Sequence, residues 1–143
     1  MKHLFCLLII TLSTLNSHAQ TSSEVIDQFF EALNSKDHVA LKLLCVDDMQ
    51  IHSLSIEANR TLSSQSFEYL TNQIQSMPED LEILEEIQSK ESIETDELAQ
   101  YTLAYSFYVN GELSHSGTNV MTLINTEEGW KISYVADTRR PKS

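Results

Sequence analysis

Hydrophobic positions recur every three or four residues in the first part of the chain, a spacing typical of helices that pack on one face. The clearest such segment spans residues 21–34, with an apolar stripe of Val25, Ile26, Phe29, Phe30 and Leu33. Thr21 and Glu24 have the spacing of a capping box, in which each side chain bonds to a free backbone N–H at the helix start. We therefore expect a first helix from Thr21 to Asn34.

Two further helices are indicated before residue 80. Asp37 is a suitable cap for a short helix that ends at Leu44, and only two residues separate it from the first helix. A third helix is expected over about 63–77, ended by Pro78, because proline cannot continue the hydrogen-bond ladder. A short strand, Met49–Leu54, lies between them.

The second half of the chain alternates between apolar and polar residues, as strands do. The alternation is clearest over 101–109 and is followed by Asn110-Gly111, a strong hairpin signal because both residues tolerate the positive φ of a type I′ turn. The chain returns over 113–124, turns again, and forms a last strand over 130–137. Residues 81–95 fit a helix or a strand by periodicity alone.

Helices followed by an antiparallel meander predict an α+β fold with the helices on one sheet face. Residues 139–143 are expected to be a frayed tail. The domain proper is therefore expected to end at residue 138.

The N-terminus has the features of a secretory signal peptide over residues 1–19. Lys2 precedes the apolar run 4–10, and the small residues Ser17 and Ala19 stand two apart, as signal peptidase requires. The run is shorter than the roughly 20 residues that span a bilayer. We expect an exported protein, periplasmic or secreted, whose domain begins at residue 20 and has no membrane contact after cleavage.

Composition excludes several classes of function. The formal net charge is −12, and loss of Lys2 makes it more negative, so nucleic acid is a poor partner. Only Cys45 remains after cleavage, which excludes an intramolecular disulfide. His52 and His115 stand apart, without the convergent spacing of metal ligands, and three glycines provide no phosphate-binding loop. We expect no metal and no cofactor.

Three segments carry a resemblance to a known superfamily. These are "VIDQFFEALNSKD" (25–37), "LLCVDDMQIHS" (43–53) and "EEGWKISYV" (127–135). With the order of elements, they resemble the NTF2-like (SnoaL-like) domains. The resemblance implies a cone of three N-terminal helices on a strongly bent antiparallel or mixed sheet, and it makes residues 81–95 a strand.

The superfamily includes ketosteroid isomerases, which use an Asp base with a Tyr and a protonated Asp that donate to the oxyanion. Alignment on the resemblance places the tyrosine at Phe29, the base at Ser53 and the protonated aspartate at Val120. A slip of one residue would put His52 or Asn119 in place, and the set would still be incomplete. The side chains at the first three positions cannot perform the three roles. We therefore expect this isomerase chemistry to be absent.

The Asn110-Gly111 turn predicts which residues share a sheet face. A two-residue turn pairs Tyr105 with Ser116, Leu103 with Thr118 and Tyr101 with Val120. By resemblance this face is the concave one, apolar with a few hydroxyl groups, as small-molecule pockets are. We expect a ligand pocket of Phe29, Phe30, His52, Ser53, Tyr101, Tyr105, Thr118 and Val120, although the same residues also suit a filled core.

The opposite face is expected to carry a large apolar patch and to form a homodimer, since NTF2-like domains often pair through such sheets. This predicted interface consists of Leu113, Met121, Leu123, Trp130, Ile132 and Tyr134.

Three functions remain open from the sequence. The leading one is binding of a small apolar ligand without catalysis. The second is a SnoaL-like cyclase or isomerase that uses His52 or Asp137 as base, which requires that residue to point into the cavity beside a second polar group. The third is a structural dimerisation module with a filled core.

Overall fold

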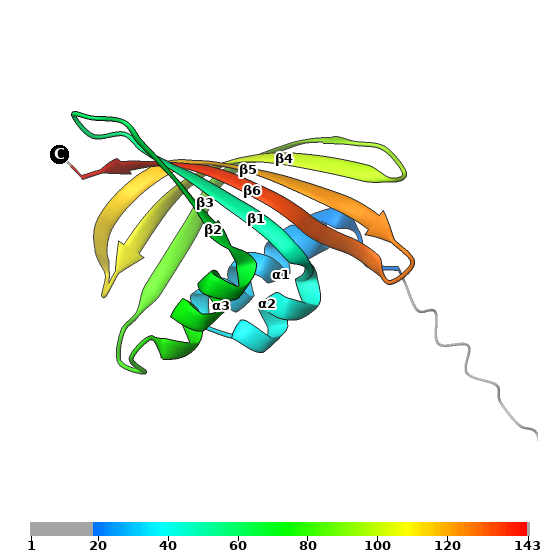
Figure 1. The fold of residues 1–143 in the computed structure, drawn as a ribbon, viewed down its shortest axis with the longest axis horizontal. Coiled ribbons are helices and arrows are strands. Elements are labelled where there is room, and N and C mark those ends of the chain that lie inside the picture. The colour runs from blue at the N-terminus through cyan, green and yellow to red at the C-terminus, as the bar shows by residue number, and fades with distance from the viewer. Residues whose placement is uncertain (1–18, 143) are drawn as a thin grey trace, which may run out of the picture.

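The computed structural model describes residues 19–142, so the predicted signal peptide lies almost entirely outside the described residues. The described chain folds into three helices and six strands (Figure 1). In chain order the elements are α1 (Ser22–Asn34), α2 (His38–Leu44), β1 (Cys45–Ser55), β2 (Thr61–Ser66), α3 (Phe67–Ser76), β3 (Ile83–Glu94), β4 (Leu98–Val109), β5 (Glu112–Thr126) and β6 (Gly129–Pro141).

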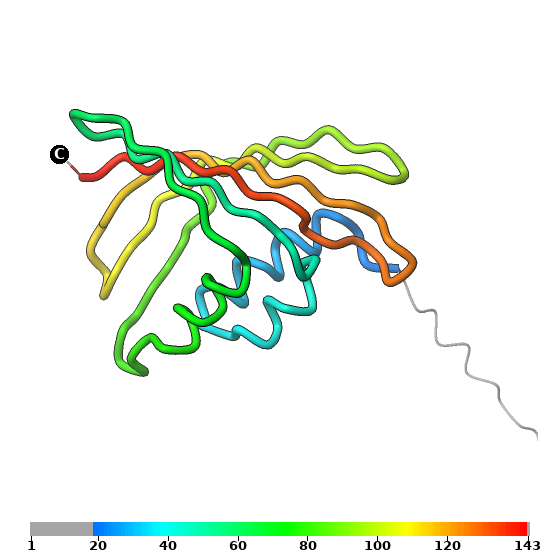
Figure 2. Tube along the Cα trace, in the orientation of Figure 1, coloured from blue at the N-terminus to red at the C-terminus, as the bar shows by residue number. Residues whose placement is uncertain are grey.

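All six strands form one sheet, in the order β2-β1-β6-β5-β4-β3. Strands β1 and β6 are parallel, and the other neighbours are antiparallel. The sheet is strongly bent, and the three helices lie together on its concave side (Figures 1 and 2). The predicted α+β cone is confirmed, and residues 81–95 contain a strand, β3, as the resemblance implied.

The first two helices begin as their sequences predict. The Thr21 and Glu24 side chains form the capping box at the start of α1. At α2, Asp37 Oδ1 accepts from the backbone N–H groups of Val39 at 3.1 Å and Ala40 at 2.9 Å. The apolar stripe of α1 is buried against the sheet, so capping and amphipathicity fix the same helix.

Two boundaries differ from the prediction. Residues 61–66 form strand β2 against β1, and α3 begins only at Phe67. The Ser66 hydroxyl caps that helix by accepting from the Tyr69 N–H at 3.2 Å. At the other end, the frayed tail is wrong: β6 continues to Pro141, pairing it with His115 of β5.

The hairpin between β4 and β5 has the predicted turn but not the predicted register. Asn110 and Gly111 have φ values of 49° and 79°, as a type I′ turn requires. A register shift then follows between Phe107 and Tyr108, because Ser114 is an extra residue on β5. Beyond this β-bulge, Tyr105 pairs with Gly117, Leu103 with Asn119 and Tyr101 with Met121. The shift exchanges the two faces of β5.

A second irregularity, between Thr122 and Leu123, separates two registers of the β5–β6 pair.

The concave face and the helices together bury the core. Its fully buried apolar members, each 0 % exposed, are Val25, Ile26, Leu41, Met49, Leu103, Met121, Leu123 and Ile132.

Lys36 joins two loops on the helical side of the molecule. It lies in the α1–α2 turn with a φ of 57°. Its Nζ donates to the backbone carbonyls of Pro78, Glu79 and Leu81 at 2.8, 3.0 and 2.8 Å. This contact ties the helical hairpin to the segment between α3 and β3.

None of the helices within residues 19–142 is long and apolar enough to cross a membrane.

Candidate functional site

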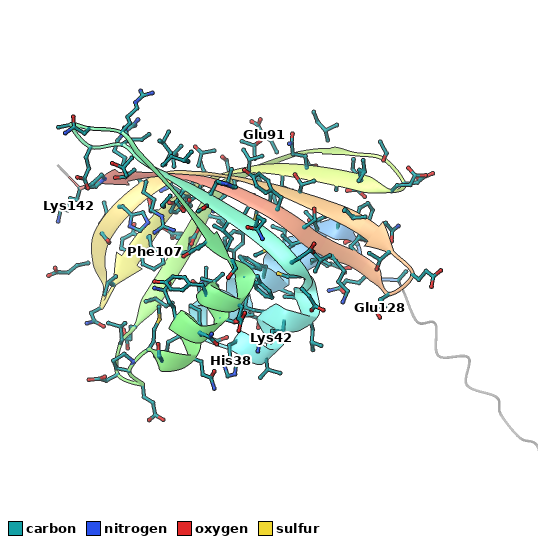
Figure 3. All side chains as sticks on the ribbon, in the orientation of Figure 1. His38, Lys42, Glu91, Phe107, Glu128 and Lys142 are labelled. Carbon is teal, nitrogen blue, oxygen red and sulfur yellow. The ribbon has the colours of Figure 1, made fainter. Side chains whose placement is uncertain are left out.

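A cavity of about 220 Å³ lies between helices α1 and α3 and the concave face of the sheet. Figure 3 places Phe107, one of its lining residues, on the side of the sheet that carries α3. Most of the wall is apolar, formed by Phe29, Phe30, Leu33, Ile51, Leu70, Ile74, Met77, Ile83, Phe107, Met121 and Val135. A wall of this kind suits a small molecule with an apolar body.

Polar side chains from five strands and one helix also line this cavity. They are Gln65 of β2, Gln73 of α3, Glu85 of β3, Tyr105 of β4, His115 and Asn119 of β5, and Asp137 and Arg139 of β6. Asn119 and Asp137 pair directly across the sheet, so their side chains share its inner face. The wall therefore combines an apolar surface with one group of polar residues.

Glu85 is a buried carboxyl group of the cavity whose pKa is raised. The Asn119 Nδ2 donates to its Oε1 at 2.6 Å. Burial raises the pKa of Glu85 to about 7, against the Asn119 hydrogen bond, which lowers it, and with a smaller contribution from the negative charge of Asp137. Near neutral pH this carboxyl group is divided between its acid and carboxylate forms.

This pKa predicts how Glu85 affects stability. Because the folded protein binds the proton more tightly than the unfolded chain, the stabilisation is full below about pH 4.5 and is lost as the pH rises through 7. In urea unfolding, the free energy of unfolding of wild type, minus that of Glu85→Gln, should fall by about 2–3 kcal/mol as the pH rises across that range. The exposed neighbour Glu86 provides the control, and Glu86→Gln should show no such trend. A flat difference for Glu85→Gln would contradict the assignment.

Asp137 is buried beside a guanidinium group. Its side chain is 8 % exposed, and its Oδ2 accepts from Arg139 Nε at 2.8 Å and from the Tyr105 hydroxyl at 3.5 Å. Its Oδ1 has no hydrogen-bond partner among the described residues. A buried carboxylate oxygen without a donor is unfavourable, so this atom is the least satisfied polar group of the cavity.

Tyr105 and His115 complete the polar wall in their neutral forms. The Tyr105 hydroxyl donates to the Thr138 carbonyl at 2.9 Å, and its pKa is raised by burial and then by the charge of Asp137. The His115 ring stacks on Phe107 with ring centroids 4.9 Å apart. Burial, and then the charge of Arg139, lower the pKa of His115.

The predicted pocket residues divide into three groups. Phe29, Phe30 and Tyr105 line the cavity. Tyr101 and Ser53 are buried but are not among its lining residues, and the Tyr101 hydroxyl contacts Ser22 Oγ at 2.7 Å instead.

The other three predicted pocket residues require correction. His52, Thr118 and Val120 line a shallow groove on the outer face of the sheet. The bulge at Ser114 accounts for Thr118 and Val120, because it reverses the side of the sheet on which each residue of β5 lies.

The same bulge overturns the predicted dimer surface. Met121, Leu123 and Ile132 are 0 % exposed within one chain, so they cannot meet a partner. Trp130 is partly buried against the same core, while Leu113 and Tyr134 are half-buried. The homodimer itself stays a prediction, without the apolar patch that motivated it.

The positions aligned with the isomerase roles do not converge. Phe29 and Asn119 line the cavity, Ser53 packs in the core, and Val120 and His52 face outward. Among residues 19–142, no group of three or more His, Cys, Asp or Glu side chains could hold a metal ion.

Of the two candidate bases, Asp137 meets the geometric condition and His52 does not. Asp137 lines the cavity beside Glu85, Tyr105 and Arg139. Glu85 and Arg139 were missed by sequence reasoning, although a signal existed for each. As a strand, residues 83–87 place Glu85 with Ile83 and Ile87, and Asp137 and Arg139 are two residues apart, so they share a strand face.

Solved structures with the same architecture define the class of this fold. An NTF2-like protein from Cytophaga hutchinsonii ATCC 33406 superposes with a TM-score of 0.66 at 10% identity, covering 82% of this chain and 93% of that one. A conserved protein from Planctomyces limnophilus DSM 3776 gives 0.66 at 17%, covering 84% and 94%. An NTF2-like superfamily protein from Salmonella enterica serovar Typhimurium gives 0.63 at 12%, covering 84% and 89%. The fold is NTF2-like.

Residues 23–135 match the family described as a domain of unknown function (DUF4829), and the chain belongs to that family. No curated protein matches the sequence.

Proposed function

We propose that this domain binds a small, mainly apolar molecule inside the cone. The observation that carries this proposal is the cavity of about 220 Å³, walled by apolar side chains of two helices and the concave sheet. A cavity of about 150 Å³ with a similar lining is large enough for benzene, so a substituted single ring is of suitable size. Export of the protein rests on the sequence alone and belongs to the same proposal.

Filling the cavity should abolish binding. Val135 lines it, whereas Val120 lies on the neighbouring strand and faces outward, so the two valines form a matched pair. With toluene as the probe and ligand-observed NMR as the measurement, wild type and Val120→Phe should bind, and Val135→Phe should lose binding at least tenfold. Circular dichroism checks that each variant is folded, and Ile51→Phe is a second filling variant on β1.

Equal toluene binding by wild type and both filling variants would exclude this cavity as the site. Absence of toluene binding to wild type would remove the proposal in favour of a filled, structural module.

Acid–base catalysis is a second candidate, favoured by one observation. Asp137 lies in the cavity beside Glu85, whose acid and carboxylate forms coexist near neutral pH. Such a pair can supply a base and an acid on the same substrate. Mass spectrometry of a bound compound before and after incubation distinguishes the two functions, since only catalysis changes the compound.

A further inference from the structure

One oxygen atom in the cavity wall lacks a partner. Asp137 Oδ1 is buried and has no hydrogen-bond donor within residues 19–142. The other carboxylate oxygen is already engaged by Arg139 Nε at 2.8 Å. Because Asp137 lines the cavity and its side chain is 8 % exposed, a molecule bound in that cavity can supply the donor that Oδ1 lacks. A ligand that brings a donor would therefore complete the site.

A second group offers the opposite capacity. Glu85 is held in the cavity by the hydrogen bond from Asn119 Nδ2 at 2.6 Å, and Asn119 pairs across the sheet with Asp137. In its acid form Glu85 is a donor, and burial favours that form. The neighbouring charged and titratable groups are Asp137 and Arg139 of β6, Tyr105 of β4 and His115 of β5. The cavity thus presents an acceptor from β6 and a donor from β3 of the same bent sheet.

The chemistry of these two groups limits which polar head group a ligand can carry. A carboxylate head cannot donate to Asp137 and would repel it. An ammonium head can donate to Asp137, but it cannot accept from the acid form of Glu85 and would pair with that group only after Glu85 loses its proton. It would also lie near the positive charge of the Arg139 guanidinium group. An ether or ketone can accept but leaves Asp137 Oδ1 without its donor. A hydroxyl group both donates and accepts, and it adds no charge to a buried site.

We propose that the cavity selects a small alcohol or phenol, whose hydroxyl group donates to Asp137 Oδ1 and accepts from the Glu85 carboxyl group. This rests on the proposed function and specifies the class of ligand. The apolar wall contacts the hydrocarbon part of the ligand, and the two carboxyl groups form hydrogen bonds with its hydroxyl group.

The test uses aromatic compounds that share one body and differ only in the head. Affinities of the mature chain for 4-methylphenol, 4-methylanisole, toluene, 4-methylbenzylamine and 4-methylbenzoate are measured by calorimetry or ligand-observed NMR at pH 6.5. We expect 4-methylphenol to bind at least tenfold more tightly than 4-methylanisole, because the ether leaves a buried oxygen unpaired. The amine and the benzoate should bind more weakly than the phenol.

Two variants assign the effect to its atoms. Asp137→Asn should reduce the preference of 4-methylphenol over 4-methylanisole, measured as the ratio of their affinities for the same variant, to less than threefold. In wild type, 4-methylphenol affinity should decrease above pH 7, as Glu85 becomes a carboxylate and stops donating. Glu85→Gln keeps a donor at that position, so it should bind the phenol with no pH dependence over the same range.

Equal affinities for the phenol and the ether, or tighter binding of the amine or the benzoate, would overturn this proposal even if toluene binds. If a water molecule is the natural partner of Asp137 Oδ1, the phenol and the ether should also bind with equal affinity, so this result too counts against the proposal. Failure of the proposed function is distinguishable, because then toluene and all the other compounds fail together.

Discussion

Replacing Gly117 by alanine is expected to lower the free energy of unfolding by about 3 kcal/mol or more. A Cβ atom at this position would lie 1.8 Å from the Thr138 carbonyl oxygen and 2.8 Å from its carbonyl carbon. Both are backbone atoms that cannot rotate away, so β5 and β6 would have to separate. That same carbonyl accepts the Tyr105 hydroxyl at 2.9 Å, and it stands between Asp137 and Arg139 in sequence. The substitution should therefore disturb the cavity as well as the sheet.

Urea unfolding of wild type and Gly117→Ala measures this effect, with Gly111→Ala as the control. Gly111 has a φ of +79°, and a Cβ atom added there would meet no neighbouring atom within 4 Å, so alanine should cost only about 1 kcal/mol of backbone strain. Similar losses for the two variants would show that close approach at Gly117 does not govern stability.

Replacing Arg139 by methionine is expected to cost about 2 kcal/mol. The change removes the guanidinium group 2.8 Å from Asp137 and leaves a carboxylate whose side chain is 8 % exposed without its charged partner. Removing one partner of a fully buried pair costs about 3–5 kcal/mol, and the smaller value here reflects the 47 % exposure of the Arg139 side chain.

A double-mutant cycle with Asp137→Asn isolates the interaction. With the charge already absent, Arg139→Met should cost much less, because no buried carboxylate is left unpaired. Lys90→Met is the matched control: its ammonium lies 2.6 Å from Asp27, but that side chain is 65 % exposed. A loss for Lys90→Met as large as that for Arg139→Met would indicate that burial of Asp137 is not the cause.

Local patterns were sufficient for most elements of the fold. Three short-range signals in the sequence are present in the structure: the Thr21–Glu24 capping box, the Asp37 cap and the Asn110-Gly111 turn. Register was not predictable in the same way. A turn fixes pairing only as far as the next bulge, and Ser114 carries no signal that marks it as an extra residue. One unpaired serine thus exchanged the predicted pocket and dimer faces of β5.

The site was predicted only in part, for related reasons. Asp137 could be identified as a candidate base because it lies in a clear strand. Arg139 follows at the start of a short basic segment with Pro141, which reads as a chain end rather than as a cavity wall. Glu85 lies in the segment whose periodicity fits both helix and strand. Its place on one face with Ile83 and Ile87 follows only if that segment is a strand, as the pairing with β4 shows.

The three hydrogen bonds of Lys36 have a consequence for how the cavity is maintained. They fix the segment that follows α3. This helix contributes Leu70, Gln73 and Ile74 to the wall, and its C-cap residue Met77 also lines the cavity. The wall is thereby ordered when the chain folds, so the entropy lost by ordering it does not count against ligand binding. A ligand of the kind proposed would then meet a preorganised cavity, and ordering of the chain would reduce its affinity little.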